Sequence, residues 1–164
     1  MLYISLGTIF TDNPAFYRTC IEAFGDGAWQ VAMTIGDLDP AAIGPVPPGI
    51  DVRPRFPQPA VLRHTRAFLS HAGMNSTMEA LYYGVPLVCL PQMPEQAANA
   101  DRVVELGLGE RLAADTLTPD ALRRAVSRVT TDEQVRANLE RMRRAIGDAG
   151  GAERGAVLIE EYLA

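Results

Sequence analysis

Two short, uninterrupted apolar segments place the strongest limit on how this chain folds. One is Ala67-Phe68-Leu69, and the other is Pro86-Leu87-Val88-Cys89-Leu90. Apolar runs of this length, without polar alternation, are typical of strands that are covered on both faces, as in a parallel sheet. A segment with helical character from Asn75 to Tyr83 lies between them and ends at Gly84, and glycine commonly terminates helices. The sequence therefore predicts a β-α-β unit in the middle of the chain.

Strand and helix patterns alternate on both sides of this unit. They cover Leu2 to Leu6, Pro14 to Phe24, Trp29 to Ile35, Ile50 to Val52 and Ala97 to Leu106. This regular succession predicts an α/β fold with a doubly wound, parallel, Rossmann-like sheet. The Gly/Pro loop over residues 36–49 is too short to separate domains. We therefore expect residues 1–164 to form a single domain.

The last third of the chain has helical character throughout. Thr118 followed by Pro119 predicts a capped helix start with proline in the first position. Thr131 and Gln134 have the spacing of a capping box, which predicts the start of the next helix. Gly150-Gly151 interrupts that helix, and a final helix is expected to reach about Leu163.

Composition and charge exclude several classes of protein. Apolar residues make up 48% and charged residues 21% of the chain, as in an ordinary folded domain. The formal charge is −5, all 15 basic residues are arginines, and no basic cluster interrupts the acidic balance. Nucleic acid is therefore not an expected partner. No apolar run is long enough to span a membrane, and no signal peptide is recognisable.

Two cysteines indicate the compartment. Cys20 and Cys89 both lie among apolar neighbours, which is typical of buried free thiols rather than of a disulfide. Free thiols are expected in a reducing environment, so the sequence predicts a cytoplasmic location. The chain begins directly with a strand-like segment, and we expect another segment to precede it.

Polar residues lie at the junction between the strand that ends near Ser70 and the helix after it. In a parallel α/β sheet, ligands bind beyond the carboxyl ends of the strands, where loops lead into helices. Free N–H groups at such a helix start suit a diphosphate, and Gly73 allows phosphates to approach the backbone. His71 is placed to donate to a phosphate, and Glu79 to accept from vicinal ribose hydroxyls. The alternative is an ordinary helix start, in which Ser76 and Glu79 form a capping box.

Three further strand ends carry polar groups. The loop from Pro54 to Pro59 holds a guanidinium and an aromatic ring suited to stacking on a nucleobase, or it is simply a proline-rich turn. The segment from Pro91 to Gln96 carries an acid and an amide suited to sugar hydroxyls, or Glu95 merely complements the helix dipole. Ser5 to Thr8 is a glycine turn with hydroxyl groups. Because the carboxyl ends of parallel strands share one edge of the sheet, we expect these loops to form one site.

Several of these segments occur together, in the same order, in one known family. They are Tyr3-Ile4-Ser5-Leu6-Gly7-Thr8, Phe56-Pro57-Gln58, His71-Ala72-Gly73-Met74-Asn75-Ser76-Thr77-Met78-Glu79-Ala80-Leu81, Gly84-Val85-Pro86, and Pro91-Gln92 through Glu95-Gln96-x-x-Asn99-Ala100. With them the chain resembles the C-terminal domain of family 1 glycosyltransferases, of the bacterial macrolide and antibiotic type. The most specific part is the His-Ala-Gly-Met segment with a glutamate eight residues after the histidine. The resemblance implies one half of a GT-B fold.

The resemblance also implies a site for a UDP- or dTDP-sugar. The implied residues are Thr8, His71, Gly73, Asn75, Ser76 and Thr77 for the diphosphate, Gln58 and Glu79 for the ribose, Arg55 and Phe56 for the base, and Glu95 and Gln96 for the sugar. No cofactor or metal is implied, because helix dipoles and hydrogen-bond donors neutralise the diphosphate in GT-B enzymes. Asp37-Leu38-Asp39 matches the metal-binding motif of a different glycosyltransferase fold, but it lies in a Gly/Pro loop without other carboxylates.

Two residues depart from the family pattern. Many relatives have tryptophan where this chain has Arg55, which leaves the base preference open. The acid that reads the sugar is often aspartate, and Glu95 is one methylene longer, which leaves the identity of the sugar open.

The function implied is that of a hexosyltransferase that transfers a sugar to a hydroxyl of a macrolide-like natural product, with inversion of configuration at the anomeric carbon. In this family the catalytic base is a histidine of an N-terminal, acceptor-binding domain. We therefore expect this chain to bind the donor and to contain no catalytic residue, with an electrostatic role for His71 and a surface or packing role for His64. Two alternatives are a stand-alone subunit that works with a separate acceptor-binding protein, and a nucleotide-sugar-binding module without a transferase role.

Overall fold

The computed structural model describes residues 1–9 and 11–163. The strands are β1 (Leu2–Ser5), β2 (Val31–Thr34), β3 (Ile50–Arg53), β4 (Ala67–Ser70), β5 (Leu87–Cys89) and β6 (Gly109–Arg111). The helices are α1 (Pro14–Phe24), α2 (Gln58–Leu62), α3 (Met74–Tyr82), α4 (Pro94–Glu105), α5 (Pro119–Thr131), α6 (Glu133–Asp148) and α7 (Gly151–Leu163), with two short 3-10 helices, η1 (Pro40–Ile43) and η2 (Ala114–Thr116). The predicted alternation of strands and helices is confirmed.

All six strands belong to one parallel sheet in the order β3-β2-β1-β4-β5-β6. The chain proceeds outward from β1 to β3 and then returns to place β4 beside β1, with Ser5 opposite Ser70. Strand order therefore reverses between β1 and β4, and such a reversal leaves a crevice at the carboxyl ends of the two strands. β6 is an additional strand that the sequence did not predict, because its Gly-Glu-Arg segment has no apolar run and pairs through its backbone with β5 alone.

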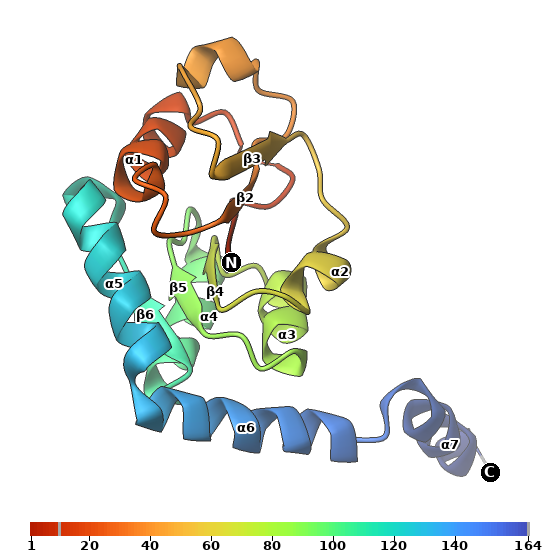
Figure 1. Cartoon of the computed structure of the whole chain (residues 1–164). Coiled ribbons are helices and arrows are strands. Elements are labelled where there is room, and N and C mark those ends of the chain that lie inside the picture. The colour runs from red at the N-terminus through yellow and green to blue at the C-terminus, as the bar shows by residue number, and fades with distance from the viewer. Residues whose placement is uncertain (10, 164) are drawn as a thin grey trace.

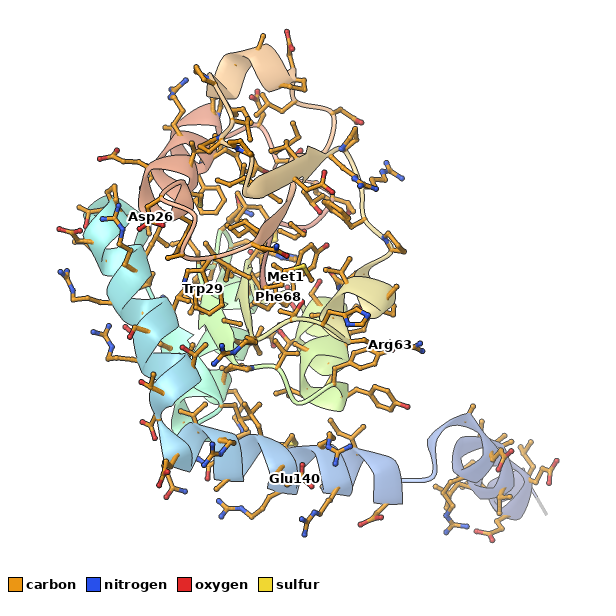
Figure 2. The ribbon with its side chains drawn as sticks, in the orientation of Figure 1. Met1, Asp26, Trp29, Arg63, Phe68 and Glu140 are labelled. Carbon is orange, nitrogen blue, oxygen red and sulfur yellow. The ribbon has the colours of Figure 1, made fainter. Side chains whose placement is uncertain are left out.

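Helices cover both faces of the sheet (Figure 1). One apolar cluster joins the sheet to α1 and α5, and the other joins it to α2, α3, α4 and α6. Successive residues of β1 alternate between the clusters, with Ile4 in the first and Tyr3 in the second. Tyr3 stacks on Phe68 with 4.7 Å between ring centroids, and Phe68 lies among the strands in Figure 2. The prediction that β4 and β5 are covered on both faces is confirmed, since all their residues are buried.

Three helix starts differ from the predicted ones. α3 begins at Met74 rather than Asn75, and α4 begins at Pro94 rather than Ala97. The predicted capping box at the start of α6 is wrong. Asp132 is the N-cap, and its carboxylate accepts from the N–H of Gln134 at 2.7 Å and of Val135 at 3.3 Å. The Thr131 hydroxyl instead donates to a backbone oxygen one turn earlier in α5.

The two thiols and the C-terminal helix complete the fold. Cys20 and Cys89 are free and buried, as predicted. Burial raises the pKa of both thiols, that of Cys89 to about 12. α7 projects away from the sheet beyond the end of α6 (Figure 1), and none of its residues is buried. Among the residues that the structure describes, no helix is both long and apolar enough to cross a membrane.

Candidate functional site

A cavity of about 300 Å³ opens at the edge of the sheet where β1 and β4 lie side by side. Loops that follow β1, β4 and β5 line it. The lining residues are Leu6, Gly7, Thr8, Ile9, His71, Gly73, Met74, Asn75, Ser76, Met93 and Gln96. Three of the four predicted loops therefore converge on one cavity at the topological switch point. The fourth, from Pro54 to Pro59, does not line the cavity, but its Gln58 donates to Ser76, which does.

The imidazole of His71 lies between two glycine backbones. A Cβ added to Gly7 would come within 2.7 Å of His71 Nε2, and a Cβ on Gly73 within 2.4 Å. Both distances are too short for a side chain, so each position requires glycine if the ring is to stay in place. Gly7 also has a positive φ of 86°, which glycine adopts without steric cost. The sequence had marked Gly73 for its small size, but it assigned no role to Gly7, which lies far from His71 along the chain.

Burial controls the charge of this imidazole. His71 Nδ1 is buried, and no group within residues 1–9 and 11–163 makes a hydrogen bond of normal geometry with it. Burial lowers the pKa of His71, and this effect outweighs the Ser5 backbone oxygen and the Glu95 carboxylate, which both act to raise it. The ring is therefore mainly neutral at pH 7 in the unliganded chain, and an anion bound in the cavity would favour its protonated form.

The first turn of α3 presents free backbone donors to the cavity. Gly73 is the N-cap and has no side chain to cap the helix. The N–H groups of Met74, Asn75 and Ser76 have no acceptor in the described part of the chain, and all three residues line the cavity. A helix start with three free donors and the positive end of the dipole attracts anions.

Thr77 differs from its prediction. The helix begins one residue earlier than expected, so the N–H of Thr77 donates to the Gly73 oxygen at 2.9 Å and is not a free donor. Its side chain is buried and its hydroxyl has no partner among the described residues. Thr77 is not one of the residues that line the cavity.

Gln58 connects the start of α2 with α3. Its amide nitrogen donates to Ser76 Oγ at 3.2 Å and to Glu79 Oε2 at 2.9 Å. The alternative capping box between Ser76 and Glu79 is therefore absent, because Gln58 bonds to both side chains and Gly73 is the N-cap. The carboxylate and amide form a half-buried polar pair beside the cavity, which is suited to two adjacent hydroxyl groups.

The two residues predicted to contact a base lie outside the cavity. Phe56 packs edge-on against Tyr3, with 6.3 Å between centroids, and the guanidinium of Arg53 lies 5.0 Å above its ring. Arg55 is exposed. Phe56 is thus engaged in packing, and the stacking role of Arg55 stays a prediction.

The start of α4 brings an amide into the cavity. Gln96 is buried, and its Oε1 accepts from the Gln92 N–H at 2.9 Å, which leaves its two N–H donors for a ligand. Glu95 is exposed, and its Oε1 accepts from Asn99 Nδ2 at 2.8 Å. Asn99 received no role from the sequence, although its position one helical turn after Glu95 predicts a contact between the two.

The remaining predicted features lie away from the cavity. His64 is exposed and precedes β4, at the opposite edge of the sheet. Asp39 is the N-cap of η1 and accepts from the Ala41 N–H at 2.9 Å. In the parts of the chain that the structure describes, no three His, Cys, Asp or Glu side chains gather as a metal site would require.

Comparison with known proteins gives a consistent picture. Residues 18–150 match the family model of the erythromycin biosynthesis protein CIII-like, C-terminal domain. The chain is 44% identical to the NDP-glycosyltransferase YjiC of Bacillus subtilis (strain 168), over 99% of this chain and 42% of that protein. The chain therefore spans about two fifths of the length of this relative.

Solved structures share the fold. CalG4, the calicheamicin glycosyltransferase, has a TM-score of 0.93 and is 44% identical, over 99% of this chain and 43% of that one. Os79 from O. sativa, solved in complex with UDP, has a TM-score of 0.76 and is 26% identical, over 87% of this chain and 35% of that one. The six-stranded parallel sheet is thus that of one half of a GT-B glycosyltransferase.

Proposed function

Because this chain belongs to the family of erythromycin biosynthesis protein CIII-like C-terminal domains, we propose that it binds the UDP- or dTDP-sugar donor of a glycosyl transfer. The observation that supports this most directly is the setting of His71. Its Nε2, held between Gly7 and Gly73, shares one cavity with the free N–H groups that open α3. These groups, with the hydroxyl of Thr8, suit the diphosphate of the donor. The UDP complex of Os79 supports the choice of nucleotide.

The ribose would bind beside the diphosphate. Glu79 and Gln58 offer acceptors and donors next to Ser76, which lines the cavity. A carboxylate suits two vicinal hydroxyls, because each hydroxyl can donate to one of its oxygens. The base would continue outward to Arg55, which is exposed and whose guanidinium has a flat face suited to stacking.

The sugar would bind at the start of α4. Gln96 presents its amide donors to the cavity, and Glu95 lies one residue before it at the surface. An acid and an amide side by side can distinguish hydroxyl positions on a sugar ring.

The reaction would proceed with inversion. The oxygen of the acceptor hydroxyl forms a bond with the anomeric carbon while the bond from that carbon to the β-phosphate oxygen breaks, and its electron pair leaves on the diphosphate. His71 and the start of α3 would stabilise the negative charge that grows there. The proton of the acceptor would pass to a base outside this chain, since His64 lies at the opposite edge of the sheet.

The acceptor would be a macrolide-like natural product bound mainly by a separate N-terminal domain. Membership of a family described by erythromycin biosynthesis, and the likeness to the calicheamicin glycosyltransferase, support a natural-product acceptor. That the chain covers 42% of the relative's length supports a further domain in the whole protein. We place the reaction in the cytoplasm, in keeping with the two free thiols.

Titration of the chain with UDP, dTDP and their glucose conjugates tests the proposal. We expect heat of binding, and NMR shifts at His71, Ser76 and Glu79, with at least one nucleotide. We expect no sugar transfer by the chain alone. The absence of shifts at these residues with both nucleotides at millimolar concentration would contradict the proposed site.

A further inference from the structure

Asn99 connects two parts of the proposed donor site. One is the loop after β4, where the diphosphate would bind, and the other is Glu95, which would contact the sugar. It lies on α4, and its side-chain nitrogen donates to the Ala72 backbone oxygen at 3.0 Å and to Glu95 Oε1 at 2.8 Å. An amide nitrogen carries two hydrogens, so it can serve both acceptors at once. Because both partners only accept, the orientation of the amide is fixed.

The backbone that Asn99 contacts has an unusual conformation. Ala72 is the one non-glycine residue with a positive φ in the described chain, at 61°, a conformation that costs energy for a residue with a Cβ. It is completely buried. Its N–H donates to Ser70 Oγ at 3.2 Å, and its oxygen accepts from Asn99. These two hydrogen bonds therefore hold a strained turn, on whose two sides His71 and Gly73 lie.

We propose that Asn99 is a positioning residue for donor binding. Its bond to Ala72 holds the left-handed turn that places His71 beside the start of α3. Its bond to Glu95 holds that carboxylate at the start of α4, next to Gln96, which lines the cavity. This proposal rests on the proposed donor site. In it, the amide group of Asn99 positions both the residues that would bind the diphosphate and the residue that would bind the sugar.

The first test of the proposal is a comparison of the Asn99→Ala chain with the unaltered chain, both without ligand. Loss of the amide leaves the Ala72 oxygen buried and without its partner, so the turn relaxes toward negative φ. We expect the coupling constant between the amide and α protons of Ala72 to change, together with the imidazole signals of His71. This measurement does not depend on nucleotide binding. Unchanged signals at both residues would contradict the proposal that Asn99 stabilises the turn.

Titration with UDP and UDP-glucose then tests the consequence for binding. Asn99→Ala should weaken UDP binding by roughly tenfold, which is the effect of one lost hydrogen bond in a buried setting. UDP-glucose should lose more than UDP, because Glu95 is also released. Affinities within twofold of those of the unaltered chain would overturn the proposal.

A second substitution separates the two roles. Glycine adopts a positive φ without strain, so Ala72→Gly in the Asn99→Ala chain should restore UDP affinity to within about twofold of the original. The additional loss with UDP-glucose should remain, since nothing replaces the contact to Glu95. If Ala72→Gly restores neither UDP affinity nor UDP-glucose affinity, Asn99 does not act by stabilising the turn at Ala72.

Asn138→Ala is a matched control. Asn138 Nδ2 donates to the oxygens of Leu106 and Gly107 at 3.2 and 3.0 Å, again at a turn with positive φ, and it does not line the cavity. Its loss should lower stability while UDP and UDP-glucose affinity remain unchanged. An equal loss of affinity in this control would show that Asn99 acts only through general stability. Failure of the unaltered chain to bind either nucleotide would instead contradict the proposed function, whereas the ligand-free signals would still report on the turn.

Discussion

Gly73 lies so close to the His71 imidazole that a Cβ on it would fall 2.4 Å from Nε2. Gly73 has an ordinary φ of −61°, so a side chain there is excluded by the ring alone and not by the backbone conformation. Glycine is therefore required at this position because of where the imidazole lies.

Gly73→Ala should displace His71 and weaken UDP binding by about fivefold or more. The methyl group needs the space of Nε2, and crowding of this kind costs about 1–3 kcal/mol. Calorimetry with UDP and chemical unfolding measure the two effects. The control is Gly147→Ala in α6, where a Cβ meets nothing within 4 Å and helix propensity should add about 0.5–1 kcal/mol of stability. Unaltered affinity in Gly73→Ala would mean that the ring does not contribute to binding.

Donor binding should take up a proton at His71. Burial lowers the pKa of this imidazole below its ordinary value, and the diphosphate raises it again. UDP-glucose affinity should therefore rise as the pH falls from about 7.5 to about 5.5. The sugar conjugate is the better probe, because the terminal phosphate of free UDP itself titrates near pH 6. His71→Gln should abolish this pH dependence, and affinity that does not vary with pH in the unaltered chain would contradict the prediction.

The same lowered pKa has a consequence for stability in the absence of nucleotide. The unfolded chain binds a proton at His71 more readily than the folded chain, so the free energy of unfolding should decrease as the pH falls through the ordinary histidine value of 6.5. Comparison of the unaltered chain with His71→Gln between about pH 7.5 and pH 5.5 isolates this contribution from that of the carboxylates. A larger decrease in His71→Gln than in the unaltered chain would reverse the sign argued here.

The order of the elements could be predicted because burial on both faces leaves a direct trace in the sequence. Ala67 to Leu69 has no polar residue, since helices cover both sides of β4. β6 left no such trace, because an edge strand is defined by its backbone bonds to β5 rather than by its side chains. The bounds of α4 were wrong for a related reason: Glu95 carries no apolar signal, although Pro94 opens the helix.

Residue types in the sequence indicated where α3 begins, but not which side chains lie around that helix start. The segment from His71 to Glu79 marked the start of α3 by its residue types. That Gly7 would contact His71 depends on β1 lying beside β4, with Ser5 opposite Ser70, and a single sequence does not give strand order. Arg55 remains a prediction, because it is exposed and nothing in the cavity constrains it.

The corrected cap of α6 can be tested by a pair of substitutions. Asp132→Ala removes the acceptor of the Gln134 and Val135 N–H groups and should lower stability by about 0.5–2 kcal/mol. Thr131→Ala removes only a bond to a backbone oxygen at an exposed position and should change stability by less than about 0.5 kcal/mol. Urea unfolding measures both. A larger loss for Thr131→Ala would restore the capping box that the sequence predicted.

Two substitutions of Gln96, by glutamate and by methionine, should together separate recognition of the sugar from recognition of the nucleotide. The carboxylate keeps an oxygen for the Gln92 N–H, which now bonds to Gln96 Oε1 at 2.9 Å, so the loop after β5 should keep its form. It loses both amide donors and adds a negative charge to the cavity. UDP-glucose should therefore bind roughly tenfold or more weakly, and UDP should weaken as well through repulsion of its phosphates. Gln96→Met, which has neither donor nor charge, is the comparison that isolates the sugar contact. It should lower UDP-glucose affinity relative to UDP, and an equal effect on both ligands would place the sugar away from Gln96.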